Sequence, residues 1–104
     1  MTAKFRKIAT LNDVPPGTMK SFEFRHHRFV LCNTGAGVFA VADECSHDSA
    51  PISEGELRGQ EIVCPRHGAR FNVKDGSVKA PPALVPIDIY AVKIDGEDIY
   101  VRLD

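Results

Sequence analysis

Short apolar or alternating runs, divided by glycine, proline and aspartate, cover most of this chain, and they predict β-strands. No long helical pattern appears, and Gly55 and Gly59 limit any helix within residues 51–60 to a single turn. Many short strands with tight turns are typical of an all-β sandwich or barrel. The predicted strands are residues 4–9, 18–24, 27–33, 38–42, 61–63, 71–73, 77–79, 87–94 and 98–103, with 87–94 the longest.

Turn signals separate these strands. The clearest are Thr34-Gly35-Ala36-Gly37, Asp75-Gly76 within a hairpin, and Asp95-Gly96. We also place a turn at Arg25-His26, although neither residue is a strong turn former. Residues 80–86 contain three prolines and therefore cannot form a central strand.

Alternation indicates which side chains share a face of a strand. Phe22 and Phe24 are two residues apart, and Ile99, Val101 and Leu103 follow the same period. We expect each set to point to one side of its strand. Cys32 lies in the run Phe29-Val30-Leu31-Cys32, where a small buried hydrophobic side chain is the simplest interpretation.

Length and charge narrow the possible classes of function. A chain of 104 residues has the size of one domain. Its 13 basic and 14 acidic residues give no basic surplus, so we expect no nucleic acid and no anionic membrane as partner. No apolar run is long enough to span a bilayer, and the first residues lack a hydrophobic signal core. These features, with an odd count of three cysteines, predict a cytoplasmic protein.

Two short motifs carry the candidate chemistry. Cys45 and His47 are separated by one residue, and Cys64 and His67 by two. Two facing loops of this kind would bring four ligands to one point, and the mixture of thiolate and imidazole favours zinc, copper or an iron–sulfur cluster over magnesium or calcium. A single zinc ion would accept two Cys and two His, and so would a [2Fe–2S] cluster. Ligand type alone leaves both open.

The residues around the ligands resemble one known family. Cys-x-His followed by Cys-Pro-x-His-Gly, with residues 48–63 between the pairs, is similar to the Rieske iron–sulfur proteins. The resemblance implies that Cys45, His47, Cys64 and His67 hold one [2Fe–2S] cluster, with both Cys on one iron and both His on the other. It also implies that Ser46, Pro65 and Gly68 shape the ligand loops.

The chain departs from the high-potential members of that family. They carry an extra Cys in each loop, where this chain has Ala50 and Arg66. They also carry a Ser and a Tyr whose hydroxyls bond to sulfur, where this chain has Ala69 and Phe71. Hydrogen bonds to sulfur stabilise the more negative, reduced state. We therefore expect a potential near the low end of the Rieske range, about −150 mV.

The resemblance covers nearly the whole chain and implies an architecture. We expect an antiparallel β-barrel or sandwich base, residues 1–42 and 77–104, with a small cluster-binding subdomain inserted at about residues 43–76. The Pro81-Pro82 segment resembles the loop that covers the cluster in this family, although a rigid surface linker is an equally good reading.

The resemblance also implies a function. We expect a ferredoxin that carries one electron from a flavin-dependent reductase to a terminal oxygenase of the aromatic-ring-hydroxylating type. We expect no catalysis by the chain itself, because the remaining His26 and His27 are adjacent and would point to opposite faces of a strand. Two alternatives stay open: a small Rieske-like subunit of an assimilatory nitrite reductase, and a zinc-stabilised interaction module.

Overall fold

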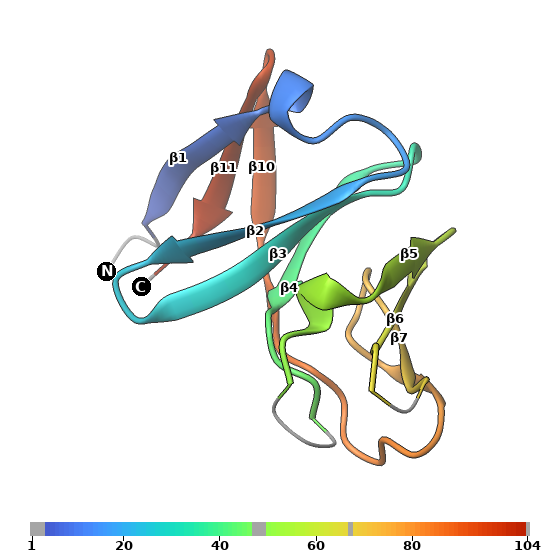
Figure 1. The fold of residues 1–104 in the computed structure, drawn as a ribbon. Helices are drawn as coiled ribbons and strands as arrows, with labels where there is room; N and C mark the ends of the chain where they lie inside the picture. The colour runs from blue at the N-terminus through green and yellow to red at the C-terminus, as the bar shows by residue number, and fades with distance from the viewer. Residues whose placement is uncertain (1–3, 47–49, 67, 104) are drawn as a thin grey trace.

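The computed structural model describes residues 4–46, 50–66 and 68–103 and consists almost entirely of β-strands (Figure 1). Two short 3-10 helices, η1 (Leu11–Asp13) and η2 (Ile52–Glu54), interrupt them. No helix in these described ranges is long and apolar enough to cross a membrane. The strands are β1 (Phe5–Thr10), β2 (Met19–Phe24), β3 (His27–Asn33), β4 (Val38–Ala42), β5 (Glu56–Arg58), β6 (Glu61–Val63), β7 (Arg70–Asn72), β8 (Val78–Ala80), β9 (Ile89–Tyr90), β10 (Val92–Asp95) and β11 (Asp98–Arg102).

The strands form three antiparallel sheets. The first has the order β1-β11-β10, the second β2-β3-β4-β9 and the third β5-β6-β7-β8. The second sheet is the middle one, with the other two packed on its opposite sides (Figure 1). The expected all-β architecture is confirmed.

The middle sheet separates two hydrophobic cores because alternate residues of a strand point to opposite faces. Phe29 and Leu31 of β3 pack with Ile99, Val101 and other residues in the core shared with the first sheet, the base core. Val30 and Cys32 of the same strand pack into the other core, the cluster-side core, together with residues of the third sheet. β3 is therefore buried on both faces, which explains its unbroken apolar run.

Most of the expected elements are confirmed. β3, β4 and β6 have the predicted bounds, β2 and β11 differ from prediction by one residue at one end, and β1 is shifted by one residue. The turn at Arg25-His26 is present, with Arg25 at a positive φ of 56°. The hairpin around Asp75-Gly76 joins β7 to β8, each shifted by one residue from its prediction.

Two expectations about strands were wrong. Residues 87–94 do not form the longest strand, because Ile89 and Tyr90 pair with β4 whereas the chain from Val92 onward pairs with β11. The segment crosses from the middle sheet to the first sheet at Ala91, whose carbonyl accepts a bond from Arg102 N–H at 2.9 Å. The alternation of apolar and polar residues cannot show that a segment changes the strand with which it pairs.

The second error is the omission of β5. Its central Leu57 is half-buried and lies opposite Ile62 of β6. The signal was present in the sequence as Glu56-Leu57-Arg58, a polar-apolar-polar triplet bounded by Gly55 and Gly59. The two glycines were interpreted only as limiting a helix, whereas they also mark the ends of a short strand.

Candidate metal centre

The two candidate cysteines lie at the beginnings of two similar loops. Cys45 follows β4 by a short connection, and Cys64 follows β6 directly. Each cysteine N–H donates to the carbonyl five residues later, Cys45 to Ala50 at 2.8 Å and Cys64 to Ala69 at 2.7 Å. Each pair of bonded residues therefore encloses one of the two candidate histidines in sequence.

The structure brings the two thiols into one buried environment. Cys45 is 0% exposed and Cys64 is 1% exposed, and both belong to the cluster-side core. Neither forms a disulfide. Two cysteines delivered by separate loops to the same core fit the sulfur half of a metal centre.

The histidine half cannot be described. His47 and His67 lie outside the residues that the structure describes, so their assignment as ligands stays a prediction. Within the described residues, no three His, Cys, Asp or Glu side chains gather where they could hold a metal ion.

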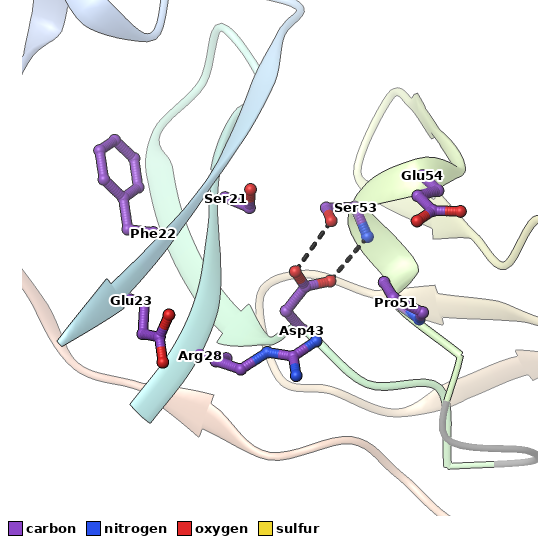
Figure 2. Close-up of a pocket in the computed structure, with 8 residues that line it drawn as sticks. All are labelled: Ser21, Phe22, Glu23, Arg28, Asp43, Pro51, Ser53 and Glu54. Carbon is purple, nitrogen blue, oxygen red and sulfur yellow. Dashed lines mark hydrogen bonds between the residues drawn. The ribbon is translucent and has the colours of Figure 1, made fainter. Parts of the chain in front are cut away.

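A residue that the sequence analysis missed anchors the first loop. The Asp43 carboxylate accepts hydrogen bonds from the N–H and the hydroxyl of Ser53, both at 2.8 Å (Figure 2). Asp43 N–H also donates to the Arg28 carbonyl of β3 at 2.9 Å. These bonds tie the residues before and after the first loop to each other and to the base. An acidic residue two positions before a candidate ligand was the available signal.

The second loop depends on a glycine. Gly68 has φ +77°, a conformation that side chains other than glycine rarely adopt, and its N–H donates to the Cys64 carbonyl at 3.2 Å. This turn returns the chain toward Ala69 and β7. The expectation that Gly68 shapes the loop is therefore consistent with the backbone that the structure shows.

The positions that lack hydroxyls are part of the cluster-side core. Ala69 and Phe71 are both 0% exposed and pack in the same core as the two cysteines. Ala50 is also buried. An apolar wall thus adjoins the thiols in the places where the high-potential proteins carry hydroxyl groups.

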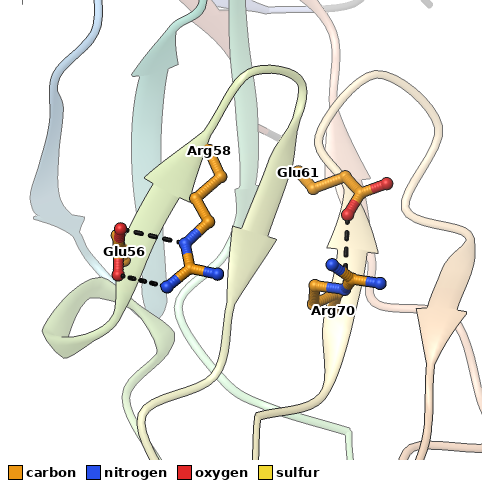
Figure 3. A network of polar contacts seen from close by, with 4 residues as sticks. All are labelled: Glu56, Arg58, Glu61 and Arg70. Atoms are coloured by element: carbon orange, nitrogen blue, oxygen red, sulfur yellow. Dashed lines mark hydrogen bonds and ion pairs between the residues drawn. The ribbon is translucent and has the colours of Figure 1, made fainter.

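Charged side chains near the loops are paired on the surface of the third sheet. Glu56 and Arg58 form a two-point ion pair with distances of 2.9 and 3.2 Å, and Glu61 lies 3.4 Å from Arg70 (Figure 3). The pairing with Arg58 lowers the pKa of Glu56 below its ordinary value. Exposed pairs of this kind contribute little to stability. Glu56 is therefore engaged by a neighbour on its own strand.

The remaining cysteine and histidines follow the simple interpretation. Cys32 is 0% exposed, and burial raises the pKa of its thiol to about 12, so it is an uncharged part of the core. His26 is exposed at the turn between β2 and β3. His27 packs edge-on against Tyr90, with ring centroids 5.8 Å apart.

The segment of residues 81–86, called here the proline loop, packs against the same core. Ala83 within it is 2% exposed, and Ile87 just after it is 6% exposed; both lie in the cluster-side core with the two cysteines. The Ser46 hydroxyl donates a hydrogen bond to the Val85 carbonyl. The proline loop is therefore packed onto the ligand-loop end of the molecule, unlike a detached linker (Figure 1).

Comparisons with known proteins agree with this geometry. The family model of the Rieske [2Fe-2S] domain matches residues 4–91. The ferredoxin component of biphenyl 2,3-dioxygenase from Rhodococcus jostii (strain RHA1) is 40% identical, covering 94% of this chain and 92% of that protein. The ferredoxin of carbazole 1,9a-dioxygenase from Nocardioides aromaticivorans IC177 superposes with a TM-score of 0.92 at 31% identity, covering 98% of this chain and 100% of that chain.

A further solved structure contains a partner. One chain of the complex of reduced oxygenase and oxidized ferredoxin in carbazole 1,9a-dioxygenase superposes with a TM-score of 0.89. It is 31% identical, and the match covers 94% of this chain and 92% of that chain. The similarity thus extends over nearly the whole chain.

Proposed function

The chain belongs to the Rieske [2Fe-2S] domain family, and on this premise we propose that it is the ferredoxin component of an aromatic-ring-hydroxylating dioxygenase system. It receives an electron from a flavin-dependent reductase and delivers it to a terminal oxygenase. The observation that carries this proposal is the delivery of Cys45 and Cys64, by two similarly closed loops, into one buried core.

We propose Cys45, His47, Cys64 and His67 as the ligands of one [2Fe–2S] cluster. When bound, the cluster accepts and releases a single electron without forming or breaking a bond to a substrate. As ligands, the two cysteines would supply negatively charged thiolates from within the core, and the two histidines would supply neutral imidazole nitrogen atoms. The chain's own residues hold these donors: Asp43 fixes the first loop and Gly68 turns the second.

The proposed function requires no catalytic residue in this chain, and its protein partners follow from the relatives. The relatives named above are components of dioxygenase systems, and one structure has a ferredoxin in complex with its oxygenase. Contacts of a shuttle with its partners are small and transient, because each partner must be released after transfer. Balanced charge supports neither nucleic acid nor an anionic membrane as a partner, and we propose the cytoplasm as its location.

We propose two structural units within the single domain. The base comprises residues 1–42 and 77–104, and the cluster-binding subdomain comprises about residues 43–76. The third sheet, most of which lies within residues 43–76, supports a separate subdomain. β8 pairs with β7, so this sheet continues past residue 76 as far as Ala80.

Metal analysis and spectroscopy test the proposal. Protein purified without oxygen is expected to be red-brown, to contain iron and inorganic sulfide in equal amounts, and to give an electron paramagnetic resonance signal when reduced. It is then expected to transfer electrons from a reductase of a biphenyl dioxygenase system to the matching oxygenase. A colourless protein that contains zinc would instead establish the interaction module. If iron and sulfide are present but no electron reaches any such oxygenase, the cluster assignment stands and the proposed partner is wrong.

A further inference from the structure

The proline loop is held firmly at its ends but not along its middle. Ala83 and Ile87 are buried in the cluster-side core, and Ile87 N–H donates to the Gly76 carbonyl at 3.0 Å. Between them, Leu84 is 89% exposed and Val85 is 59% exposed. Apolar packing therefore does little to hold the middle of the loop against the rest of the molecule.

A hydrogen bond, and not apolar packing, holds the middle of the proline loop to the rest of the molecule. The Ser46 hydroxyl donates to the carbonyl of Val85, which is 39 residues away in sequence. Ser46 stands directly between Cys45 and His47, and Cys45 N–H closes its own loop onto Ala50. The bond therefore connects the exposed middle of the proline loop to the first ligand loop itself.

We propose that Ser46 is a positioning residue that tethers the proline loop across the ligand loops and so limits the access of solvent to the metal centre. The inference rests on the proposed function, in which Cys45 is a ligand. Solvent access matters because the apolar side chains around a metal site control how easily water reaches the metal, and so how long the metal stays bound. The family resemblance implies only that Ser46 shapes its own loop, whereas the structure joins its exposed side chain to a segment distant in sequence.

A pair of substitutions of equal shape isolates the effect of the hydroxyl group. Threonine in Ser46→Thr keeps the donor, and valine in Ser46→Val has nearly the shape of threonine without a donor. Ser46→Ala removes the donor without adding bulk. Thr18→Ala is a matched control, because the Thr18 hydroxyl donates to the Pro15 carbonyl at 2.7 Å in an exposed turn of the base. It removes a bond of the same kind far from the ligand loops in sequence.

Hydrogen exchange followed by mass spectrometry on the iron-loaded protein measures the tether directly. One ordinary hydrogen bond changes a local opening equilibrium about five-fold. Peptides covering residues 83–87 are expected to exchange about five-fold faster in Ser46→Ala and Ser46→Val, and at the unsubstituted rate in Ser46→Thr. Thr18→Ala is expected to leave these peptides unchanged. Equal exchange in Ser46→Thr and Ser46→Val would overturn the tether.

The second measurement tests whether the tether limits access to the metal centre. It follows the loss of the cluster's visible absorbance in the presence of a ferrous-iron chelator. Starting from equal iron content, Ser46→Val is expected to bleach several-fold faster than Ser46→Thr, with Thr18→Ala at the unsubstituted rate. Faster exchange without faster bleaching would overturn the guarding role. Absence of iron and sulfide from the unsubstituted protein would instead refute the proposed function, while the exchange comparison would still test the tether.

Discussion

At the scale of single residues, three cysteines share one core, and we propose different roles for them. Cys32, Cys45 and Cys64 are all buried in the cluster-side core, and none forms a disulfide. Burial alone therefore does not identify a ligand. The difference is local: Cys32 belongs to the middle of β3, whereas Cys45 and Cys64 begin loops that carry a histidine. In this chain only the two loops place a cysteine and a histidine close together in sequence.

This difference predicts the outcome of cysteine substitution. Cys45→Ser and Cys64→Ser are expected to abolish binding of iron and sulfide, because a serine hydroxyl is a poor substitute for a thiolate ligand. Cys32→Ala is expected to keep the full iron content and to lower the free energy of unfolding by about 1 kcal/mol through lost packing. Iron analysis and urea unfolding measure the two effects. Loss of iron in Cys32→Ala, with the fold intact, would contradict the assignment.

Phe71 gives a second prediction at this scale. It is fully buried in the core that holds both cysteines, at the position where the family's high-potential members carry a hydroxyl. Phe71→Tyr is expected to raise the reduction potential by about 40 mV, which corresponds to one hydrogen bond of about 1 kcal/mol to sulfur. Redox titration measures the shift, and Phe39→Tyr, which substitutes a partly buried residue at the edge of the same core, is the control. An equal shift in both variants would exclude a specific bond to sulfur.

At the scale of elements, the loops depend on anchors outside the ligand motifs. Asp43 and Asp75 make the same pair of bonds, each accepting from the N–H and the hydroxyl of a serine, Ser53 and Ser77 respectively. They differ in environment, since Asp43 is buried whereas Asp75 lies in an exposed turn. A bond made away from water leaves a larger penalty when one partner is lost.

The pair forms a matched comparison. Asp43→Ala is expected to lower the free energy of unfolding by about 2 kcal/mol, because two part-buried donors of Ser53 lose their acceptor. Asp75→Ala is expected to cost no more than about 0.5 kcal/mol, because water replaces the carboxylate. Urea unfolding of both variants measures the difference. Equal costs would show that Asp43 does not anchor the first loop.

A glycine holds the proline loop to the β7–β8 hairpin. At Gly76, φ is +78°, and an added Cβ would lie 2.2 Å from the Ile87 carbonyl oxygen. Gly96 has φ +63° but nothing within 4 Å of an added Cβ. The two positions share a left-handed backbone conformation and differ in the space available for a side chain.

Alanine substitution at the two glycines separates these effects. Gly96→Ala is expected to cost about 1 kcal/mol through the left-handed conformation alone. Gly76→Ala is expected to cost at least about 2 kcal/mol more, because the backbone at Ile87 must move away. Thermal unfolding of the two variants provides the test, and a Gly76→Ala protein as stable as Gly96→Ala would show that the contact is easily relieved.

At the scale of the whole molecule, the middle sheet divides the protein into two halves with unequal dependence on a metal. The base core contains no cysteine, whereas the cluster-side core contains all three. Ligand binding stabilises the folded state by its affinity for that state over the unfolded chain. The stabilisation by a cluster should therefore be concentrated on one side of the middle sheet.

Removal of iron tests this asymmetry. We expect the metal-free protein to melt at a lower temperature than the loaded protein. We expect its hydrogen exchange to rise at least ten-fold in residues 43–46 and 64–66, with little change in β1, β10 and β11. Exchange mass spectrometry before and after chelation measures both halves in one sample. A uniform rise across the chain would mean that the two cores unfold as one unit.

The sequence by itself determined most of the strands, the main turns and the two ligand motifs. These features depend on local properties: the alternation of Phe22 and Phe24, the backbone freedom of Gly76, and the spacing of Cys64 and His67. The apolar run of β3 also predicted the burial of Cys32. The sequence could not show that Val30 and Leu31 face two different cores. Neighbouring residues of a strand point to opposite faces, but this pattern does not indicate which elements cover each face.

Only the tertiary structure decided the partners of distant segments. It divided residues 87–94 between two sheets, revealed β5, and joined Asp43 to Ser53 and Ser46 to Val85. Such contacts arise when separate parts of the chain meet, so no local pattern records them. The motifs specified which atoms could bind a metal, whereas the packing of three sheets placed the two thiols in one core.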